Sequence, residues 1–347
     1  EERSYCQNER KDEVILRVNT CAVCTYDVRV VRGGHIKVRP PVILGHELCA
    51  TTEGSLTITD RTISKARTST TIIKADSRVA VCPIVPCLYC LFCSQKKYNL
   101  CIDLKEIGSS LDGGFAEYIV IPQRVLRIGG IVSVPNNLSD DEAALLEPLA
   151  CCLNGFSNMG QQITKETTVT VIGDGPIGLL HLQISKKLYD ARTMVVGKIP
   201  HRIEIAKLLG ADAIINNIDT NNSAKDILNL TNGIGSSIII IATSDPAALR
   251  LALSIASKGS IINIFAGIAG GNHIFLDPNW LHYNQVAITG SFSSTPHMLQ
   301  QAARLASYGK INLSRMVSHR YSLNEVQEAL LATEKYYGLR AVINDFE

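Results

Sequence analysis

The stretch from about residue 167 to about residue 289 restricts the fold more than any other part of this chain. Short, continuously apolar runs alternate there with longer segments of amphipathic, helical pattern. Continuous apolar strands joined by helices are typical of a parallel sheet that is covered on both faces. The sequence therefore predicts an α/β domain with a doubly wound parallel sheet. The predicted strands are Val169–Ile172, Thr193–Val196, Ala213–Ile215, Ile238–Ile241 and Ser260–Ile264.

A glycine-rich turn, Gly-Asp-Gly-Pro-Ile-Gly, follows the first predicted strand and precedes a predicted helix. The glycine pattern alone is a weak signal, but its position between a strand and a helix indicates a dinucleotide site. We expect Gly173 to permit the turn, Gly175 to let the backbone approach a pyrophosphate, and Gly178 to allow close packing of helix against strand. Pro176 and Ile177 lie between them, where the first N–H groups of the helix would face the phosphates.

The turn after the second predicted strand bears on which dinucleotide binds. An acidic residue is typical there in NAD-binding proteins, because it holds the ribose 2′-hydroxyl. This chain has Gly197 at that position, followed by Lys198, His201 and Arg202, where a cation could meet a 2′-phosphate. The pattern favours NADP over NAD. The alternative is that Arg202 only begins a helix and faces solvent.

Four cysteines lie close together at Cys87, Cys90, Cys93 and Cys101, a spacing that can surround one tetrahedral zinc ion. Four thiolates leave no open position for water, so such an ion would hold a loop together and would not react. Disulfides are disfavoured in a large chain without a secretory leader, and an iron–sulfur cluster of the bacterial ferredoxin type would have a proline after the last cysteine. The spacing predicts a structural zinc lobe over residues 83–104.

Length and composition narrow the class of protein. A chain of 347 residues predicts two domains, each with its own core. The net charge of +2 gives no reason to expect a nucleic-acid or membrane partner, and no apolar run approaches the ~18 residues of a membrane span. Eleven cysteines without a leader indicate a reducing compartment, so we expect a cytoplasmic protein.

The chain before about residue 126 has short β-branched runs and many turn residues, which predict a β-rich domain of irregular, barrel-like type. The segment 55–73, rich in Thr, Ser and Ile, predicts an exposed hairpin to which we assign no function. Ser139 and the acids after it predict the start of a helix that runs towards Glu147. A last strand is predicted over 340–343, returning to the first domain.

A second group of potential metal ligands lies in the N-terminal part of the chain. Cys24 and the adjacent pair His46 and Glu47 are residue types that bind zinc, although their wide separation is a weaker signal than the cysteine spacing. The alternative is a buried thiol and a hydrogen-bonded core histidine. Two potential ligands side by side at a turn, with Asp27 available as a carboxylate that orients them, favour a metal site.

These motifs carry a family resemblance over nearly the whole chain and in the family's order. The sequence resembles the zinc-containing medium-chain dehydrogenases of the sorbitol, threonine and secondary-alcohol type, and its Glu-Pro-Leu-Ala segment is most similar to the polyol dehydrogenases. The matching segments are Cys21–Asp27, Gly45–Glu47, the four-cysteine stretch, Asp112–Tyr118, Glu147–Ala150, the glycine turn, His282–Tyr283 and Thr289–Phe292.

The resemblance implies roles for individual residues. Cys24, His46 and Glu47 correspond to the ligands of a catalytic zinc ion. Glu147 stands where many members supply a further ligand, and Asp27 would orient the group. Zinc would favour loss of the proton from a bound alcohol, and hydride would pass to the nicotinamide of NADP or NAD. The implied activity is that of a zinc-dependent oxidoreductase acting on a secondary alcohol, polyol or sugar.

The resemblance also implies a domain organisation. Residues 1–150 would form the catalytic domain with the structural zinc lobe, residues 151–291 the dinucleotide-binding domain, and residues 292–347 would return to the catalytic domain. Members of the family form homodimers or homotetramers, so we expect the same here. The expected partner is a small-molecule alcohol or carbonyl substrate.

Two positions depart from the family pattern. Tyr26 stands where relatives carry Ser or Thr to pass the alcohol proton outward, and Arg29 stands where a relay histidine is common. A phenol can donate and accept hydrogen bonds but is larger, and a guanidinium cannot act as a base. The proton path and the preferred alcohol therefore stay open. The alternatives are oxidation of threonine or another amino alcohol, and a zinc- and nucleotide-binding protein that has lost turnover.

Overall fold

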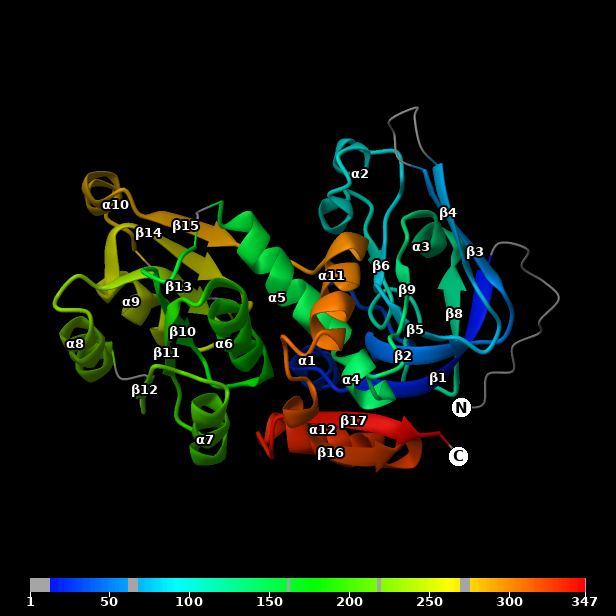
Figure 1. Ribbon diagram of the computed structural model, residues 1–347. Helices are drawn as coiled ribbons and strands as arrows, with labels where there is room; N and C mark the ends of the chain where they lie inside the picture. The colour runs from blue at the N-terminus through cyan, green and yellow to red at the C-terminus, as the bar shows by residue number, and fades with distance from the viewer. Residues whose placement is uncertain (1–12, 62–67, 161–162, 217–219, 269–274, 347) are drawn as a thin grey trace.

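The computed structural model consists of two lobes that lie side by side (Figure 1). The lobe on the right of Figure 1 carries the first and the last strands of the chain, and the lobe on the left carries the middle of the chain. No helix in the described parts of the chain is long and apolar enough to cross a bilayer. The described residues are 13–61, 68–160, 163–216, 220–268 and 275–346.

The first lobe is built on a mixed sheet. Its strands are β1 (Glu13–Ala22), β2 (Glu47–Thr52), β5 (Arg78–Val81), β8 (Tyr118–Pro122), β9 (Ile131–Ser133), β16 (Val317–Ser322) and β17 (Arg340–Asp345). The order is β16-β17-β1-β2-β5-β9, and β8 pairs with the first half of β1. Among the described strands, the end strands β16 and β9 do not pair with each other. The expected β-rich lobe is therefore an irregular open sheet, not a closed barrel.

Shorter elements surround this sheet. Two strands, β3 (Leu56–Arg61) and β4 (Thr68–Ile73), pair as the hairpin predicted for this segment, and residues 62–67 between them lie outside the described residues. The remaining elements of this lobe are α1 (Thr25–Gly33), β6 (Ile84–Val85), α2 (Leu91–Ser94), η1 (Tyr98–Leu100), β7 (Lys105–Glu106), α3 (Gln123–Arg127), α4 (Asp140–Ala144), η2 (Ser314–Met316), η3 (Leu323–Glu325) and α12 (Val326–Glu334).

The sequence predicts the C-terminal strand correctly but predicts the helix that begins after Ser139 incorrectly. β17 confirms the predicted last strand and pairs antiparallel with β1, whereas β16, which runs parallel to β17, is not predicted. The single helix expected from Ser139 towards Glu147 is wrong, because the structure has α4 and then a separate helix α5 (Leu146–Asn158). Pro148 lies in the first turn of α5. N–H groups in the first turn of a helix have no acceptor within the helix, so a proline there costs no hydrogen bond.

The second lobe is built on a fully parallel sheet with helices on its faces (Figure 1). Its strands are β10 (Thr168–Ile172), β11 (Arg192–Val196), β12 (Ala213–Ile215), β13 (Ser236–Ile241), β14 (Ala256–Ile264) and β15 (Ala287–Gly290). Its helices are α6 (Pro176–Tyr189), α7 (Pro200–Leu208), α8 (Thr220–Leu230), α9 (Ala247–Ser254) and α10 (Pro278–Asn284). The order β12-β11-β10-β13-β14-β15 confirms the predicted doubly wound sheet and reverses direction between β10 and β13. Ligands of such sheets bind at the carboxyl ends of the strands beside that reversal.

A continuous buried core joins the two lobes. Helix α5 packs against α11 (Pro296–Ser307) between the lobes (Figure 1). Cys82, after the mixed sheet, belongs to the same hydrophobic cluster as Leu149 of α5 and Val171 of β10. The division predicted between residues 150 and 151 falls inside α5, and the domain boundaries stay a prediction.

His181 of α6 is a polar side chain buried within this apolar core. Its side chain is 0% exposed, and neither ring nitrogen has a hydrogen-bond partner in the described part of the chain. The ring lies edge-on to Phe265 at a centroid distance of 4.5 Å and also contacts Phe156. Burial among these apolar groups lowers the pKa of His181 to about 3. The imidazole is therefore neutral in the folded protein at physiological pH.

We predict that His181 makes the protein less stable in acid. The folded pKa lies below the ordinary value of about 6.5, so the unfolded chain takes up the proton first as the pH falls below that value. His181→Leu removes this difference. Between pH 7 and pH 5, urea denaturation of the zinc-loaded protein should show that the wild type loses about 2 kcal/mol more free energy of unfolding than the variant. Equal losses in both proteins would contradict the assignment.

Candidate active site and metal centres

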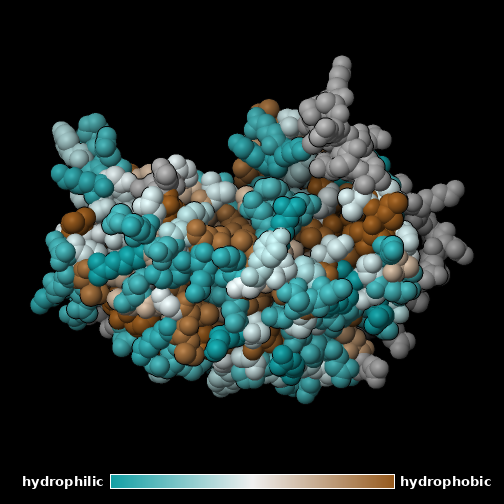
Figure 2. Space-filling view, viewed as in Figure 1, coloured by the Kyte–Doolittle hydropathy of each residue, from teal (hydrophilic) through white to brown (hydrophobic). Residues whose placement is uncertain are grey.

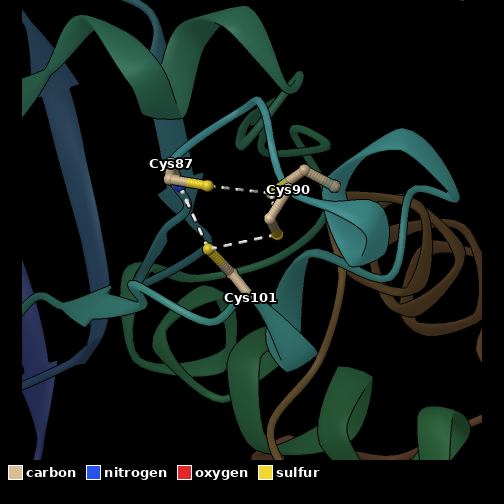
Figure 3. A group of neighbouring side chains, drawn as sticks. Cys87, Cys90 and Cys101 are labelled. Atoms are coloured by element: carbon tan, nitrogen blue, oxygen red, sulfur yellow. Dashed lines mark hydrogen bonds between the residues drawn. The ribbon is translucent and has the colours of Figure 1, made fainter.

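The four clustered cysteines come together in a small lobe beside the mixed sheet. Figure 3 shows the sulfur atoms of Cys87, Cys90 and Cys101 turned towards one another, and Cys93 completes the group. The Sγ–Sγ distances are 3.5 Å between Cys90 and Cys93, 3.9 Å between Cys87 and Cys93, and 3.9 Å between Cys90 and Cys101. A tetrahedron with Zn–S bonds of about 2.3 Å has edges of about 3.8 Å. The geometry fits one zinc ion, and all four residues are free cysteines that form no disulfide.

Hydrogen bonds to sulfur also suit this lobe to thiolate ligands. The N–H group of Cys87 donates to the sulfur of Cys101 at 3.2 Å. Backbone N–H groups of Ile102 and Cys93 lower the pKa of the Cys90 thiol to about 6. All four cysteines are buried. The lobe is therefore prepared to hold a metal through sulfur alone, as the spacing predicts.

The second predicted group assembles where the first lobe meets the second. Cys24 is the N-cap residue of α1, and His46 and Glu47 lie at the start of β2. One ligand atom from each of the three residues lies within 4.8 Å of the others. The turn before His46 requires Gly45, which has φ +93°, and a Cβ there would lie 2.7 Å from Cys21 Sγ. The pairing of β2 with β1, in which Glu47 lies opposite Ala22, brings these residues to Cys24, and Gly45 permits the turn into β2.

Asp27 orients this group from the first turn of α1. Its Oδ2 accepts a hydrogen bond from the N–H of Cys24 at 2.8 Å, and its Oδ1 lies 3.5 Å from Nδ1 of His46. The contact occupies Nδ1, which leaves Nε2 of the imidazole available to a metal. Burial lowers the pKa of His46, but the Asp27 carboxylate outweighs this and holds the pKa well above its usual value.

Arg340 of β17 is a member of the site that sequence reasoning missed. Its Nη2 lies 3.1 Å from Oε1 of Glu47, and its Nη1 donates to the carbonyl of Val23 at 3.0 Å. Burial raises the pKa of Glu47, and Arg340 partly offsets the rise. The other oxygen of Glu47, Oε2, is buried and has no hydrogen-bond partner among the described residues. A buried carboxylate oxygen with no partner, beside a thiol and an imidazole, fits a metal ligand.

Glu147 lies near this group but not in it. The three-residue cluster does not include its carboxylate, which accepts a hydrogen bond from the Cys151 thiol at 3.1 Å. Burial raises the pKa of Glu147 to about 7, and the charges of His46 and Glu47 also act on it. Its role as a further ligand stays a prediction, and the helical spacing of Glu147 and Cys151 is the signal that could have revealed their contact.

Tyr26 lies beside His46 with its ring edge-on, at a centroid distance of 5.7 Å. Its hydroxyl lies 2.8 Å from Ser109 Oγ and 3.5 Å from Nδ1 of the exposed His35. Burial raises the pKa of Tyr26, and the hydrogen bond with Ser109 partly offsets this. Neither Ser109 nor His35 stands out in the sequence, because both come from loops that only the fold brings to Tyr26.

The glycine turn has the expected geometry. Gly173 has φ +123°, and a Cβ there would lie 2.8 Å from the carbonyl oxygen of Ala242. A Cβ on Gly178 would overlap the carbonyl oxygen of Gly173. Gly175 is the N-cap residue of α6, and Pro176 and Ile177 begin that helix. The N-terminus of α6 therefore lies at the carboxyl end of β10, open to close backbone approach.

The turn after β11 contains an acid that the sequence pattern does not reveal. The Asp174 carboxylate accepts hydrogen bonds from the N–H groups of Lys198 and Ile199 at 2.7 and 2.8 Å. A Cβ on Gly197 would lie 2.5 Å from the Asp174 side chain, so this contact requires glycine at 197. The acidic group at this turn comes from the glycine loop, not from the end of the second strand.

The basic residues of the same turn have different environments. Lys198 is exposed, whereas Arg202 is only 5% exposed, so the alternative that it faces solvent is wrong. Its Nε donates to the carbonyl of Gly338 at 2.8 Å, and its guanidinium lies over the ring of Tyr336. The nearest neighbour of a Cβ built on Gly175 is Arg202 Nη1, at 3.7 Å. Arg202 thus links the glycine loop to the segment that leads into β17.

Family comparisons agree with this geometry. Residues 10–129 match the alcohol dehydrogenase GroES-like domain, and residues 176–308 match the zinc-binding dehydrogenase model. The chain is 31% identical to the sorbitol dehydrogenase of Bacillus subtilis, over 92% of this chain and 86% of that protein. The chain belongs to the zinc-containing medium-chain dehydrogenase family. This membership makes it an NAD(P)-dependent oxidoreductase of the alcohol and polyol dehydrogenase type.

The chain is also similar to other dehydrogenases in sequence and in structure. The D-arabitol-phosphate dehydrogenase of Enterococcus avium is 30% identical, over 92% of this chain and 86% of that protein. A zinc-binding dehydrogenase from Sinorhizobium meliloti 1021, solved bound to NADP, superposes with a TM-score of 0.83 at 25% identity, over 96% of this chain and 92% of that chain. An alcohol dehydrogenase from Escherichia coli CFT073, complexed with NADH, superposes with a TM-score of 0.83 at 26% identity, over 98% of this chain and 94% of that chain.

We predict that the two metal centres can be emptied separately. Metal analysis of the purified protein should find about two zinc ions per chain. Cys24→Ser should lose about one of them and keep its thermal stability, because Cys24 is only partly buried and the ion pair of Glu47 with Arg340 stays in place. Cys87→Ser should lose the other and unfold its lobe at a lower temperature, since a structural zinc contributes folding energy. One zinc ion in the wild type would show that one of the two sites is misassigned.

Proposed function

We propose that this protein transfers hydride between NADP or NAD and a secondary alcohol, polyol or sugar, with a zinc ion held by Cys24, His46 and Glu47. The observation that carries the proposal is the convergence of these three side chains, whose ligand atoms lie within 4.8 Å of one another. They stand at the border between a mixed sheet and a doubly wound sheet, which is where a bound dinucleotide and a metal can face each other.

In this proposal the residues around the metal have distinct tasks. Asp27 fixes the imidazole of His46, and Arg340 neutralises part of the charge of Glu47. Glu147, in the first turn of α5, would supply a further ligand to the zinc ion. When bound, zinc stabilises negative charge on the substrate oxygen, and the dinucleotide carries the hydride. Tyr26 borders the space beside His46 and limits the bulk of a substrate there.

The dinucleotide would lie along the carboxyl ends of the parallel strands. Gly173, Gly175 and Gly178 let the pyrophosphate approach the N-terminus of α6. We propose NADP as the preferred cofactor, with Lys198 and Arg202 near the 2′-phosphate. Arg202 already lies beside the glycine loop, and Asp174, the one acid found at this turn, is occupied by two backbone N–H groups.

Polyols are favoured over amino alcohols as substrates. The sorbitol and D-arabitol-phosphate dehydrogenases are 31% and 30% identical to this chain, whereas the L-threonine 3-dehydrogenase of Bacillus licheniformis is 24% identical. Loss of turnover is disfavoured because Cys24, His46 and Glu47 converge and the glycine loop has suitable geometry.

Assembly as a homodimer or homotetramer and a cytoplasmic location stay predictions. The exposed edge of the parallel sheet supports assembly, because β15 pairs only with β14 among the described strands. Phe275 is 100% exposed and Tyr283 is 75% exposed in the segment that leads to β15. A strand edge beside exposed apolar side chains suits pairing with a second copy of the chain.

The activity is tested by following nicotinamide absorbance with each cofactor and a panel of polyols, secondary alcohols and L-threonine. We expect turnover of at least one polyol and its loss, by 10³-fold or more, in Cys24→Ser, because the metal can then no longer act on the substrate oxygen. Binding of NADPH, measured by fluorescence, should persist in that variant. Turnover that survives Cys24→Ser would remove the metal group from the mechanism.

Cofactor preference has a separate test. Replacing Lys198 and Arg202 together by alanine should raise the dissociation constant for NADPH by about tenfold or more, because two charge-assisted contacts are lost. The constant for NADH should change by about threefold or less. Lys207→Ala, on the same helix α7 and paired with Glu204, is the matched control. An equal loss for both cofactors would contradict the preference.

A further inference from the structure

Helix α1 carries two arginines with different surroundings. Arg32 forms an ion pair with Glu334, with Nη2 2.7 Å from the carboxylate. Arg29 is exposed, and among the described residues its one polar contact is a long hydrogen bond from Nη1 to the carbonyl of Gly267, at 3.4 Å. Among the described residues no carboxylate lies within ion-pairing distance of Arg29. Arg29 therefore offers a guanidinium whose charge no described carboxylate neutralises.

The position of Arg29 distinguishes it from an ordinary surface arginine. It belongs to the same helix that begins at Cys24 and contains Tyr26 and Asp27, so it is tied to the metal-binding group. Its contact, Gly267, follows the carboxyl end of β14, at the edge of the sheet where a dinucleotide binds. The guanidinium thus bridges the two lobes, on the helix that begins at Cys24 and beside the sheet edge where a dinucleotide would bind.

A second cation reaches the same border. Lys37 follows α1, and its Nζ lies 4.5 Å from the centroid of the Phe292 ring, just beyond β15. Lys37 is paired with Glu106 at 3.1 Å, so most of its charge is already compensated. Figure 2 shows a depression between the two lobes on the face that it presents. Arg29 and Lys37 both cross from the first lobe to the carboxyl ends of neighbouring parallel strands.

The chemistry of a guanidinium indicates which group it would bind. Its planar set of N–H donors matches the oxygens of a phosphate or carboxylate and gives no advantage with an uncharged hydroxyl. A polyol dehydrogenase holds the reacting hydroxyl at its metal, so a guanidinium at the border meets a more distant part of the substrate. A terminal phosphate on the polyol would place its charge there.

We propose that Arg29 binds the phosphate of a phosphorylated polyol, which makes such a compound the preferred substrate. The inference rests on the proposed dehydrogenase function and deepens it. A secondary alcohol of the substrate is oxidised to a ketone, NADP⁺ is reduced to NADPH, one proton is released, and the phosphoester bond stays intact. The 30% identity to a D-arabitol-phosphate dehydrogenase agrees with this substrate class.

The test compares matched substrate pairs on the zinc-loaded enzyme. D-arabitol is compared with D-arabitol 5-phosphate, and sorbitol with sorbitol 6-phosphate, by kcat/KM at saturating cofactor. The wild type should prefer the phosphorylated member of at least one pair by tenfold or more. Arg29→Gln should reduce that ratio at least tenfold, mainly through KM, and Arg29→Lys should keep part of it. Arg32→Gln, on the same helix but paired with Glu334, should leave the ratio unchanged.

Two outcomes would overturn the proposal. One is a wild-type ratio near one; the other is an Arg29→Gln variant that raises the KM for the cofactor but leaves the ratio unchanged, which would assign Arg29 to the cofactor. If no compound is turned over, calorimetry tests whether Arg29 binds phosphate. It compares the binding of glycerol 3-phosphate with that of glycerol to the NADPH-bound protein. Phosphate-dependent binding that Arg29→Gln abolishes would support the inference although the proposed activity fails, and its absence would overturn the inference.

Discussion

The ion pair between Glu47 and Arg340 is the interaction on which the rest of the site depends. Both side chains are almost fully buried, and their charged atoms lie 3.1 Å apart. Removing one partner of such a pair typically costs about 3–5 kcal/mol, because the other charge is left buried and unpaired. The pair therefore fixes β17, from the end of the chain, against the start of β2, where His46 and Glu47 lie. The returning C-terminal segment thus supplies the charge that compensates Glu47 in the metal-binding group.

A second set of contacts fixes the two sheets relative to each other. Arg202 reaches from α7 to the carbonyl of Gly338, Asn99 of the cysteine lobe donates to the carbonyl of Phe292 at 2.8 Å, and Arg29 reaches Gly267. Each contact joins a side chain of one lobe to backbone of the other. Hydride transfer needs metal and nicotinamide at a fixed separation, and these contacts hold the elements that would carry them.

The sequence was informative wherever function depends on local spacing. The four cysteines, the glycine turn and the apolar strand pattern each lie within a short stretch, so residue type and interval predicted their geometry well. It was less informative about boundaries: the break between α4 and α5, and strand β16, depend on packing that no local pattern encodes. The contacts of Arg202 were not predicted for the same reason, since Gly338 and Tyr336 are distant in the chain.

The sequence by itself thus determined the class of the fold, the sulfur site and the types of residue available for chemistry. Only the tertiary structure decided which of these residues meet. It joined Cys24 to His46 and Glu47, paired Glu47 with Arg340 and left Glu147 in contact with Cys151. It also gave Arg32 a carboxylate, whereas Arg29 has none among the residues that the structure describes. The physical reason is that a short-range sequence pattern depends on the backbone geometry of its own segment, and that geometry does not require the rest of the chain. Charge neutralisation and metal coordination depend on distances between segments, and those distances are fixed only when the whole chain packs.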